Sequence, residues 1–232
     1  MNKTILKRRN MKKILIVMIL LTAGVAAQDR IEKNLGDFNE LKTYRGLQVE
    51  LIESDSPKVI IEGSKASAVT VKNINGVLKI SMKIENTFSS DEVMVYLYYS
   101  KPIALIHANE GSNVFADKEL KQDRVEVVAQ EGARVKFDLE VRDVEVTAST
   151  GGYIKLSGTA DSQAVKVNTG GIYKGADLKT KNTKISAATG GNGEVFATGS
   201  VDARASTAGV IDIEGDPETL TVKESTGGNI SS

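Results

Sequence analysis

The sequence contains no cysteine and no tryptophan, and only three of its 232 residues are proline. Without cysteine the chain can form no disulfide, no thiolate metal site and no thiol nucleophile. Its single histidine, His107, cannot provide a multi-histidine metal site, and no spacing suggests a Ser/His/Asp set. Glycine is common, with 21 residues. This composition favours a β-rich protein with many turns over a helical one.

The first 27 residues have the layout of a secretory signal peptide. A basic leader precedes the apolar run Ile14–Leu21, small residues follow, and cleavage is expected between Ala27 and Gln28. The apolar run is short for a membrane span, which favours cleavage over the alternative of an uncleaved anchor. Translation could begin at Met1 or at Met11, since the signal is complete from either.

Removal of this segment would change the charge balance. Six basic residues and no acidic ones precede Gln28, so the mature chain has 24 basic and 30 acidic residues and a net charge of −6. A net negative charge argues against nucleic acid and against an anionic membrane surface as partners. We therefore expect an extracytoplasmic protein with no membrane span after signal cleavage, located in the periplasm, on the outer surface or secreted.

A four-residue pattern occurs five times in the second half of the chain. Its copies read STGG, NTGG, ATGG, STAG and STGG. Their threonines lie 18 to 20 residues apart and are Thr150, Thr169, Thr189, Thr207 and Thr226. Two weaker copies place Glu110 and Glu131 at the threonine position, so seven units of about 20 residues run from Ile106 to the C-terminus.

Apolar residues recur at fixed distances from this anchor position. Four residues before it lie Ile106, Val127, Val146, Val165, Ile185, Ala203 and Val222. Similar sets lie two residues before, four after and six after the anchor, and the positions between them are mostly polar. This alternation is typical of strands with one buried face. A fixed period of this length without a helical pattern predicts an all-β, β-helix-like solenoid of about seven rungs.

The repeated tetrapeptide is interpreted as the corner between two strands of one rung. Glycine supplies the positive φ angle of a sharp corner, and a second glycine leaves room for close stacking. The threonine is expected at a strand end, with its hydroxyl bonded along a ladder of like residues. Ala208 in place of a first glycine implies a stricter demand on Gly209, and Gly193 indicates an extra loop in the stretch GGNGEVF. The corner glycines are Gly151, Gly152, Gly170, Gly171, Gly190, Gly191, Gly209, Gly227 and Gly228.

Residues 28–105 lack the corner pattern but also predict strands. Val69–Val71 and Leu78–Met82 alternate on either side of a turn at Asn73–Gly76, and Asp91–Tyr99 is a longer strand. We expect antiparallel strands here that start the solenoid and cover its first rung, because an uncovered solenoid end exposes unpaired backbone.

The order of these features resembles a known family. The signal peptide, the stretches GLQVELIESDSPKVIIEG and NGVLKISM, a strand followed by proline, and glycine-marked units ending in IEGDPETLTVKESTGGNI are similar to the bacterial head GIN domain family of putative auto-transporter adhesins. This family is a domain of unknown function, and its members usually have Ser-Gly-Ser-Gly or a similar sequence at this corner. The resemblance implies a β-helix-like fold, an extracytoplasmic location in Bacteroidetes-type bacteria, and adhesion. It brings no catalytic residues.

The mature chain is expected to form one β-solenoid domain over residues 28–232. Residues 28–105 are its strand-rich N-terminal part and residues 106–232 are its glycine-marked repeats. Tyr96 and Tyr98 share a strand face and are the candidates for contact with sugar rings. Packing across strands is the structural alternative for both.

Evidence for catalysis or metal binding is weak in the sequence. One outward row could serve a polysaccharide-cleaving enzyme, although exposed charge also keeps a sheet soluble. Its members are Lys136, Lys155, Lys174 and Asp212. Asp55, Asp161 and Asp216 lack the spacing of a calcium repeat, so neither a metal nor another cofactor is expected.

Three functions remain open at this point. The favoured one is a non-catalytic secreted or cell-envelope β-solenoid, an adhesin or binding module with a glycan or an envelope protein as its partner. The first alternative is a polysaccharide-active β-helix enzyme. The second is a self-assembling structural subunit that forms homo-oligomers through the solenoid ends.

Overall fold

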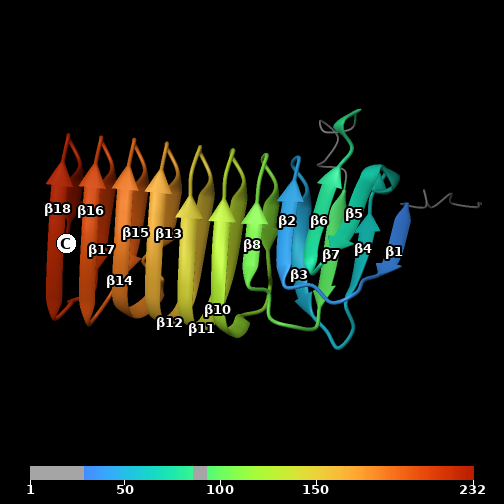
Figure 1. Cartoon of the computed structure of the whole chain (residues 1–232), viewed down its shortest axis with the longest axis horizontal. Coiled ribbons are helices and arrows are strands. Elements are labelled where there is room, and N and C mark those ends of the chain that lie inside the picture. Colours follow the sequence, from blue (N-terminus) through green and yellow to red (C-terminus); the bar gives the residue numbers. More distant parts are fainter. Residues whose placement is uncertain (1–28, 86–92) are drawn as a thin grey trace, which may run out of the picture.

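The computed structural model describes residues 29–85 and 93–232, and the predicted signal peptide lies outside them. The regular structure in the described residues is β-strand, apart from short 3-10 segments at Ala66–Ala68 and at residues 84–85. The strands form rungs that stack along the long axis of the molecule (Figure 1), which confirms the predicted β-solenoid. No helix among these residues is long and apolar enough to cross a membrane.

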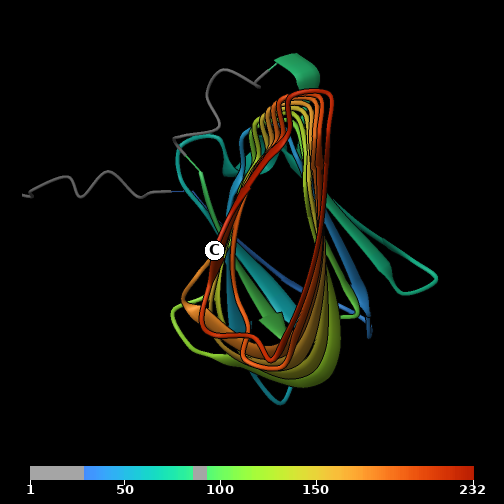
Figure 2. The ribbon, with the colours of Figure 1, turned by 90° about the vertical axis from the view of Figure 1, so that its left-hand side faces the viewer.

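Each rung is a flattened coil with two walls. The entry wall consists of strands that run into a corner: β2 (Glu40–Tyr44), β8 (Leu105–Ala108), β10 (Leu120–Ala129), β14 (Leu178–Ala188), β16 (Ser200–Ser206) and β18 (Thr219–Ser225). The exit wall consists of strands that leave it: β3 (Gln48–Glu53), β9 (Asn113–Phe115), β13 (Ile172–Gly175), β15 (Asn192–Phe196), β17 (Val210–Glu214) and β19 (Asn229–Ser231). Two long strands, β11 (Arg134–Ala148) and β12 (Tyr153–Asn168), belong first to the exit wall and then to the next entry wall. Seen down the axis, the walls meet at a sharp edge and are joined by a rounded edge opposite (Figure 2).

The apolar columns predicted from the repeat are confirmed by the register of the parallel strands. The column that begins at Ile106 pairs residue by residue through Val127 and Val146 to Val222. Its members between Ile106 and Ala203 are at most 3% exposed and form one core with the other inward columns. Burial of these side chains supplies the main stabilisation of the coil.

The extra loop predicted at Gly193 is wrong. Gly193 keeps its place in the column and pairs with Tyr173 on one side and Ile211 on the other. A Cβ at Gly193 would lie 2.7 Å from Cδ1 of Ile185, which reaches across from the entry wall. The glycine is therefore a packing requirement of the core and not the mark of an insertion.

The Thr-Gly-Gly corners are type I′ turns. The threonines have φ angles of 48 to 52° and the residues after them 59 to 74°. The N–H of the second glycine closes the turn, as in the 2.9 Å bond from Gly152 to the carbonyl of Ser149. The expected placement of the threonine at a strand end is therefore wrong, because Thr150 and its equivalents occupy the left-handed region that disfavours β-branched residues.

Backbone hydrogen bonds, rather than threonine hydroxyls, join one corner to the next. The N–H of Gly151 donates to the carbonyl of Thr169 at 3.2 Å, and the same bond recurs from rung to rung. Among the described residues no hydroxyl bond links two corner threonines. A Cβ at Gly209 would lie 2.3 Å from the carbonyl oxygen of Ala187. The stricter demand predicted for Gly209 therefore comes from this close approach, while Ala208 adopts a φ angle of 59°.

An eighth corner, which the sequence pattern did not reveal, lies at Arg45 and Gly46. Their φ angles are 61 and 69°, and the N–H of Gly46 donates to the carbonyl of Glu110 at 2.8 Å. The strands β2 and β3 thus form a complete parallel rung. The N-terminal part is therefore not antiparallel throughout, although its remaining strands cover this rung as predicted.

These remaining strands form the cap of the solenoid. Two of them, β6 (Val77–Met82) and β7 (Met94–Tyr99), stack in parallel on β2 and β3. Three are antiparallel to their neighbours: β1 (Arg30–Asn34), β4 (Lys58–Glu62) and β5 (Val69–Ile74). The turn predicted at Asn73–Gly76 is confirmed, with Asn75 and Gly76 at φ angles of 53 and 82°.

Candidate functional site

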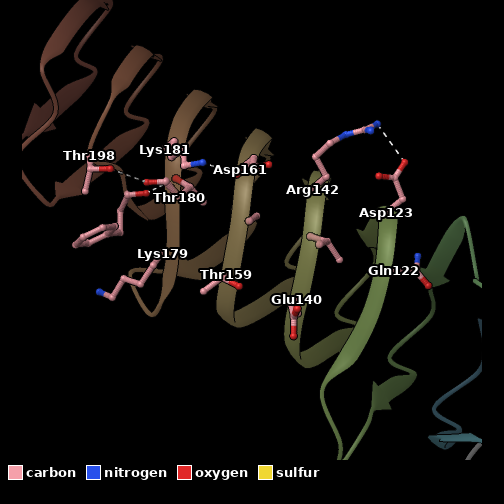
Figure 3. Close-up of a pocket in the computed structure, with 13 residues that line it drawn as sticks. Gln122, Asp123, Glu140, Arg142, Thr159, Asp161, Lys179, Thr180, Lys181 and Thr198 are labelled. Carbon is pink, nitrogen blue, oxygen red and sulfur yellow. Dashed lines mark hydrogen bonds and ion pairs between the residues drawn. The ribbon is translucent and has the colours of Figure 1, made fainter.

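A polar depression along the repeats lies at the rounded edge, opposite the corners. This rounded-edge groove has a volume of about 530 Å³ and crosses strands β10, β11, β12 and β14 (Figure 3). Its lining residues are Gln122, Asp123, Glu140, Val141, Arg142, Thr159, Ala160, Asp161, Lys179, Thr180, Lys181, Phe196 and Thr198. The parallel register places the equivalent residues of successive rungs side by side.

The floor of the groove is small and mostly apolar. Val141, Ala160 and Thr180 face one another in neighbouring rungs and are 8, 7 and 3% exposed. The Thr180 hydroxyl donates to the carbonyl of Phe196 at 2.5 Å. Because the small side chains leave space above them, the floor lies lower than the charged side chains beside it.

A row of alternating charges forms one rim. Asp123, Arg142, Asp161 and Lys181 follow one another along the axis (Figure 3). Arg142 Nη2 lies 3.1 Å from Asp123 Oδ2, and Lys181 Nζ lies 2.9 Å from Asp161 Oδ1. The groove thus offers hydrogen-bond donors and acceptors in turn, one per rung.

The far end of the groove carries its aromatic side chain. Lys179 Nζ lies 3.8 Å from the centroid of the half-buried Phe196 ring. Beneath it, a buried network joins Tyr173, Gln163 and Thr183: the Tyr173 hydroxyl donates to Gln163 Oε1 at 2.8 Å, and Gln163 Nε2 donates to Thr183 Oγ1 at 3.0 Å. Burial raises the pKa of Tyr173. This network is satisfied and holds the wall behind the groove in place.

Two ionisable groups at this edge, Asp143 and Arg142, are held in their charged forms. Hydrogen bonds from Ser162, Arg142 and Arg124 lower the pKa of Asp143 to about 2. The hydrogen bond to Asp143 and the charge of Asp123 raise the pKa of Arg142. A general acid or base works best with a pKa near the working pH, so these groups suit binding better than proton transfer. Within residues 29–85 and 93–232, no group of three His, Cys, Asp or Glu side chains could hold a metal ion.

The tyrosines predicted as ligand contacts lie elsewhere. Tyr96 and Tyr98 lie half-buried on β7, in the cap. Tyr96 pairs with Ile60, and Tyr98 pairs with Lys58, whose Nζ lies 5.0 Å from the Tyr98 ring centroid. These contacts agree with the structural alternative of packing across strands, and their role in ligand contact stays a prediction. The predicted corner glycines lie together at the sharp edge, away from the groove.

The outward row proposed for catalysis does form on the exit wall. Lys136, Lys155 and Lys174 are in register, and Asp212 follows beyond Glu194. Lys174 pairs with Glu194, and Lys155 Nζ lies 3.3 Å from Asp177 Oδ2.

The remaining predicted candidates are dispersed. His107 lies on the entry wall beside Lys42, and burial, with a contribution from Lys42, lowers its pKa. Asp161 is bound by Lys181 in the groove rim, while Asp55 and Asp216 lie in exposed loops. The structure therefore does not bring the three aspartates together as a site.

The groove itself was missed in the sequence, although a signal for it exists. Asp123, Arg142, Asp161 and Lys181 all lie eight residues before the anchor of their unit, with alternating sign. A search for alternating charge at one offset of the repeat would have found the rim. The floor could not be found this way, because its small residues look like ordinary core positions.

Comparison with known proteins places the chain among bacterial solenoids. Residues 37–217 match the family model described as putative auto-transporter adhesin, head GIN domain. The fold is similar to that of a putative adhesin from Bacteroides fragilis NCTC 9343, with a TM-score of 0.82, 18% identity, and coverage of 88% of this chain and 96% of the other. A putative lipid binding protein from Parabacteroides distasonis ATCC 8503 is similar with a TM-score of 0.67, 20% identity, and the same coverage of 88 and 96%. No curated protein sequence matches the chain. At these identities the structural likeness concerns the fold alone.

Proposed function

This chain belongs to the putative auto-transporter adhesin, head GIN domain family, and from that premise we propose that it is an extracytoplasmic binding module which holds a glycan in the rounded-edge groove. It binds this ligand without transforming it. The adhesin-like family and the similar solenoids described as adhesins support a binding role. The predicted signal peptide supports a place outside the cytoplasm.

One observation carries the choice of ligand class. Charged side chains of alternating sign recur once per rung along a groove of about 530 Å³. Neighbouring rungs are about 4.8 Å apart, which is close to the length of one sugar ring in an extended chain. Sugar hydroxyls both donate and accept hydrogen bonds, so an uncharged glycan can use carboxylates and cationic groups in turn. The small side chains of the floor leave room for such a chain beside the charged rim.

The charge states support binding over catalysis. Asp143 and Arg142 at this edge have pKa values that are shifted further toward their charged forms. A polysaccharide-cleaving enzyme would need a group moved toward neutral pH. That alternative has a direct readout, because a lyase would release unsaturated products from uronate polymers.

A glycan array with the mature chain, residues 28–232, tests the proposal. Arg142→Gln removes the central cation of the rim, and Arg134→Gln removes the same charge from the same strand near the sharp edge. We expect Arg142→Gln to weaken retention of the bound glycan about tenfold, because it removes charge-assisted hydrogen bonds. Arg134→Gln should bind as the unchanged protein does.

Three results would overturn the proposal. The first is that no glycan on a broad array is retained. The second is that Arg142→Gln and the unchanged protein bind equally well. The third is the appearance of unsaturated products from uronate polymers, which would replace the binding module by an enzyme.

A further inference from the structure

A second depression, unrelated to the groove, lies where the cap meets the first complete rung. This lysine pocket has a volume of about 530 Å³ and opens between β2, β5, β6 and the corner at Arg45. Four basic side chains line it, Arg45, Lys72, Lys79 and Lys83, against two acidic ones, Glu85 and Glu110. The pocket is therefore positive in a chain whose predicted mature form is net negative.

The lysines are placed where a sheet normally avoids them. Lys72 and Lys79 lie directly opposite each other on the antiparallel strands β5 and β6. Lys79 is also in register with Lys42 on β2. Like charges directly opposite on neighbouring strands destabilise a sheet. The fold thus tolerates three cations in one cross-strand row.

Three lysines of the pocket have no carboxylate partner among the described residues, whereas several lysines of the repeats have one. Lys121 pairs with Glu140 and Lys181 pairs with Asp161, each across one rung. In the described part of the chain, Lys72, Lys79 and Lys83 make no ion pair. Four cations therefore share this pocket, and of the four Arg45 alone has a carboxylate of residues 29–85 and 93–232 within ion-pair distance.

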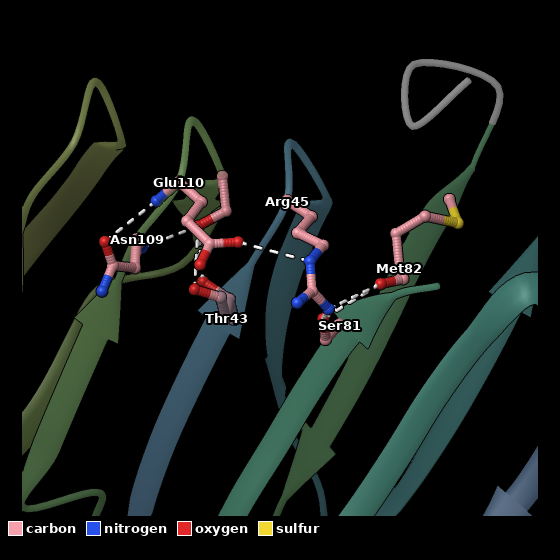
Figure 4. Close-up of polar contacts among 7 residues, drawn as sticks. Thr43, Arg45, Ser81, Met82, Asn109 and Glu110 are labelled. Carbon is pink, nitrogen blue, oxygen red and sulfur yellow. Dashed lines mark hydrogen bonds and ion pairs between the residues drawn. The ribbon is translucent and has the colours of Figure 1, made fainter. Parts of the chain in front are cut away.

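Arg45 adds a fixed donor to the pocket. Its Nη1 donates to Ser81 Oγ at 2.7 Å and to the Met82 carbonyl at 3.0 Å, and its Nε lies 3.5 Å from Glu110 Oε2 (Figure 4). These contacts engage Nε and Nη1 and orient the guanidinium, whose Nη2 N–H groups remain as donors. The hydroxyls of Thr70 and Ser81 also line the pocket.

We propose that the lysine pocket binds a phosphate monoester group. An oriented guanidinium with several flexible ammonium groups is the chemistry that recognises a doubly charged phosphate. The anion would reduce the repulsion between Lys72 and Lys79, so its binding would also stabilise the cap. The phosphate can belong to a soluble compound or to a lipid headgroup, because both present the same charged oxygens.

Calorimetric titration of the mature chain at low ionic strength tests the proposal. The probes are inorganic phosphate, glycerol 3-phosphate, and phosphatidylcholine vesicles with and without phosphatidic acid. The variant is Lys72→Gln/Lys79→Gln, and the matched control is Lys136→Gln/Lys166→Gln, which removes two exposed lysines elsewhere. We expect the variant to bind about tenfold more weakly and the control to bind as the unchanged protein does.

Thermal unfolding tests the repulsion directly. The gain in Tm on adding phosphate then distinguishes binding from a merely structural role of the lysines. Without ligand, Lys79→Gln should raise Tm by about 1–3 °C because repulsion is relieved. With saturating phosphate, the unchanged protein should gain more in Tm than this variant. A lower Tm for Lys79→Gln without ligand would contradict the repulsion on which the proposal stands.

The arms of the titration also separate the source of the phosphate. Binding of glycerol 3-phosphate alone supports a soluble ligand, and binding of phosphatidic acid vesicles alone supports a lipid headgroup. The proposal is overturned if no probe binds. It is equally overturned if Lys72→Gln/Lys79→Gln and the control bind a probe equally well.

Discussion

The sharp edge and the rounded edge of the coil differ in how regularly their backbone repeats from rung to rung. At the sharp edge the same backbone turn occurs eight times with nearly the same φ angles, and each corner before the last donates the same backbone bond to the next rung. At the rounded edge the connections differ from rung to rung: β11 and β12 continue through it, whereas β13 and β14 are separate strands. The groove lies on this variable edge. The most repeated feature of the chain therefore explains how the coil is built, and the variable edge carries its distinctive surface.

The difference has a physical cause. A type I′ turn needs two residues in the left-handed region. At the second glycine of the five Thr-Gly-Gly or Thr-Ala-Gly corners, a Cβ would also lie 2.1 to 2.4 Å from the backbone of an earlier rung. A wider bend has no such requirement, so its residues are free to differ in charge and size. Side-chain pairs then hold neighbouring rungs together there, as Lys181 and Asp161 do.

The largest expected effect tests the sharp edge. A Cβ at Gly152 would lie 2.1 Å from the carbonyl oxygen of Ala129, whereas one at Gly151 would meet nothing nearer than 4.0 Å. Gly152→Ala should therefore lower the free energy of unfolding by about 1–3 kcal/mol. The matched variant Gly151→Ala should lose about 1 kcal/mol, the cost of alanine at a positive φ angle. Denaturant unfolding measures both.

An equal loss of unfolding free energy in Gly152→Ala and Gly151→Ala would contradict this account of the sharp edge. Ala133 holds the place of the second glycine one rung earlier and closes the same turn, with a 3.0 Å bond to the Gln130 carbonyl. Equal losses would mean that neighbouring rungs move apart locally wherever a methyl group is added. The corner would then be less strict than its geometry indicates.

A second substitution should improve the sharp edge. Thr169 has a φ angle of 50°, which asparagine adopts more readily than a β-branched residue. Thr169→Asn should raise the free energy of unfolding by about 0.5–1 kcal/mol. Thr147→Asn, the same change on an entry-wall strand, should lower it, since asparagine is unfavourable in strands. The interpretation of the corner fails if both changes act in the same direction in thermal unfolding.

The smallest effect tests the rounded edge. Asp143 has a folded-state pKa of about 2, below the usual aspartate value of 3.8, so its contribution to stability is present above about pH 4. That contribution is lost as the pH falls from about 4 to about 2. Asp143→Asn should therefore lose less Tm than the unchanged protein between pH 6 and pH 3. The effect is small because exposed charges are screened.

Asp138→Asn, on the same strand but outside this charge cluster, provides the control. It should follow the unchanged protein over this pH range. If the two aspartate variants respond alike, side-chain pairing does not distinguish the rounded edge from the rest of the coil.

The features that could be predicted from the sequence were those that repeat with a fixed period. The register of the columns from Ile106 onward followed directly from the spacing of the corners, and the strands confirmed it. The corner at Arg45 and Gly46 was missed because no Thr-Gly-Gly marks it. The chain also leaves the stack after β3, builds the cap and then returns to form β8. The order of rungs therefore differs from the order of the sequence.

The sequence by itself determined that this protein is a β-solenoid with corners at the repeated tetrapeptide. Its strand period and its glycines are local properties, and every unit repeats them. Only the tertiary structure decided which side chains meet across rungs. Arg45, Lys72 and Lys79 come together because the hairpin of β5 and β6 stacks on β2, which lies far from it in the chain. The rounded-edge groove likewise exists only when rungs stack, since the residues that line it come from several neighbouring strands.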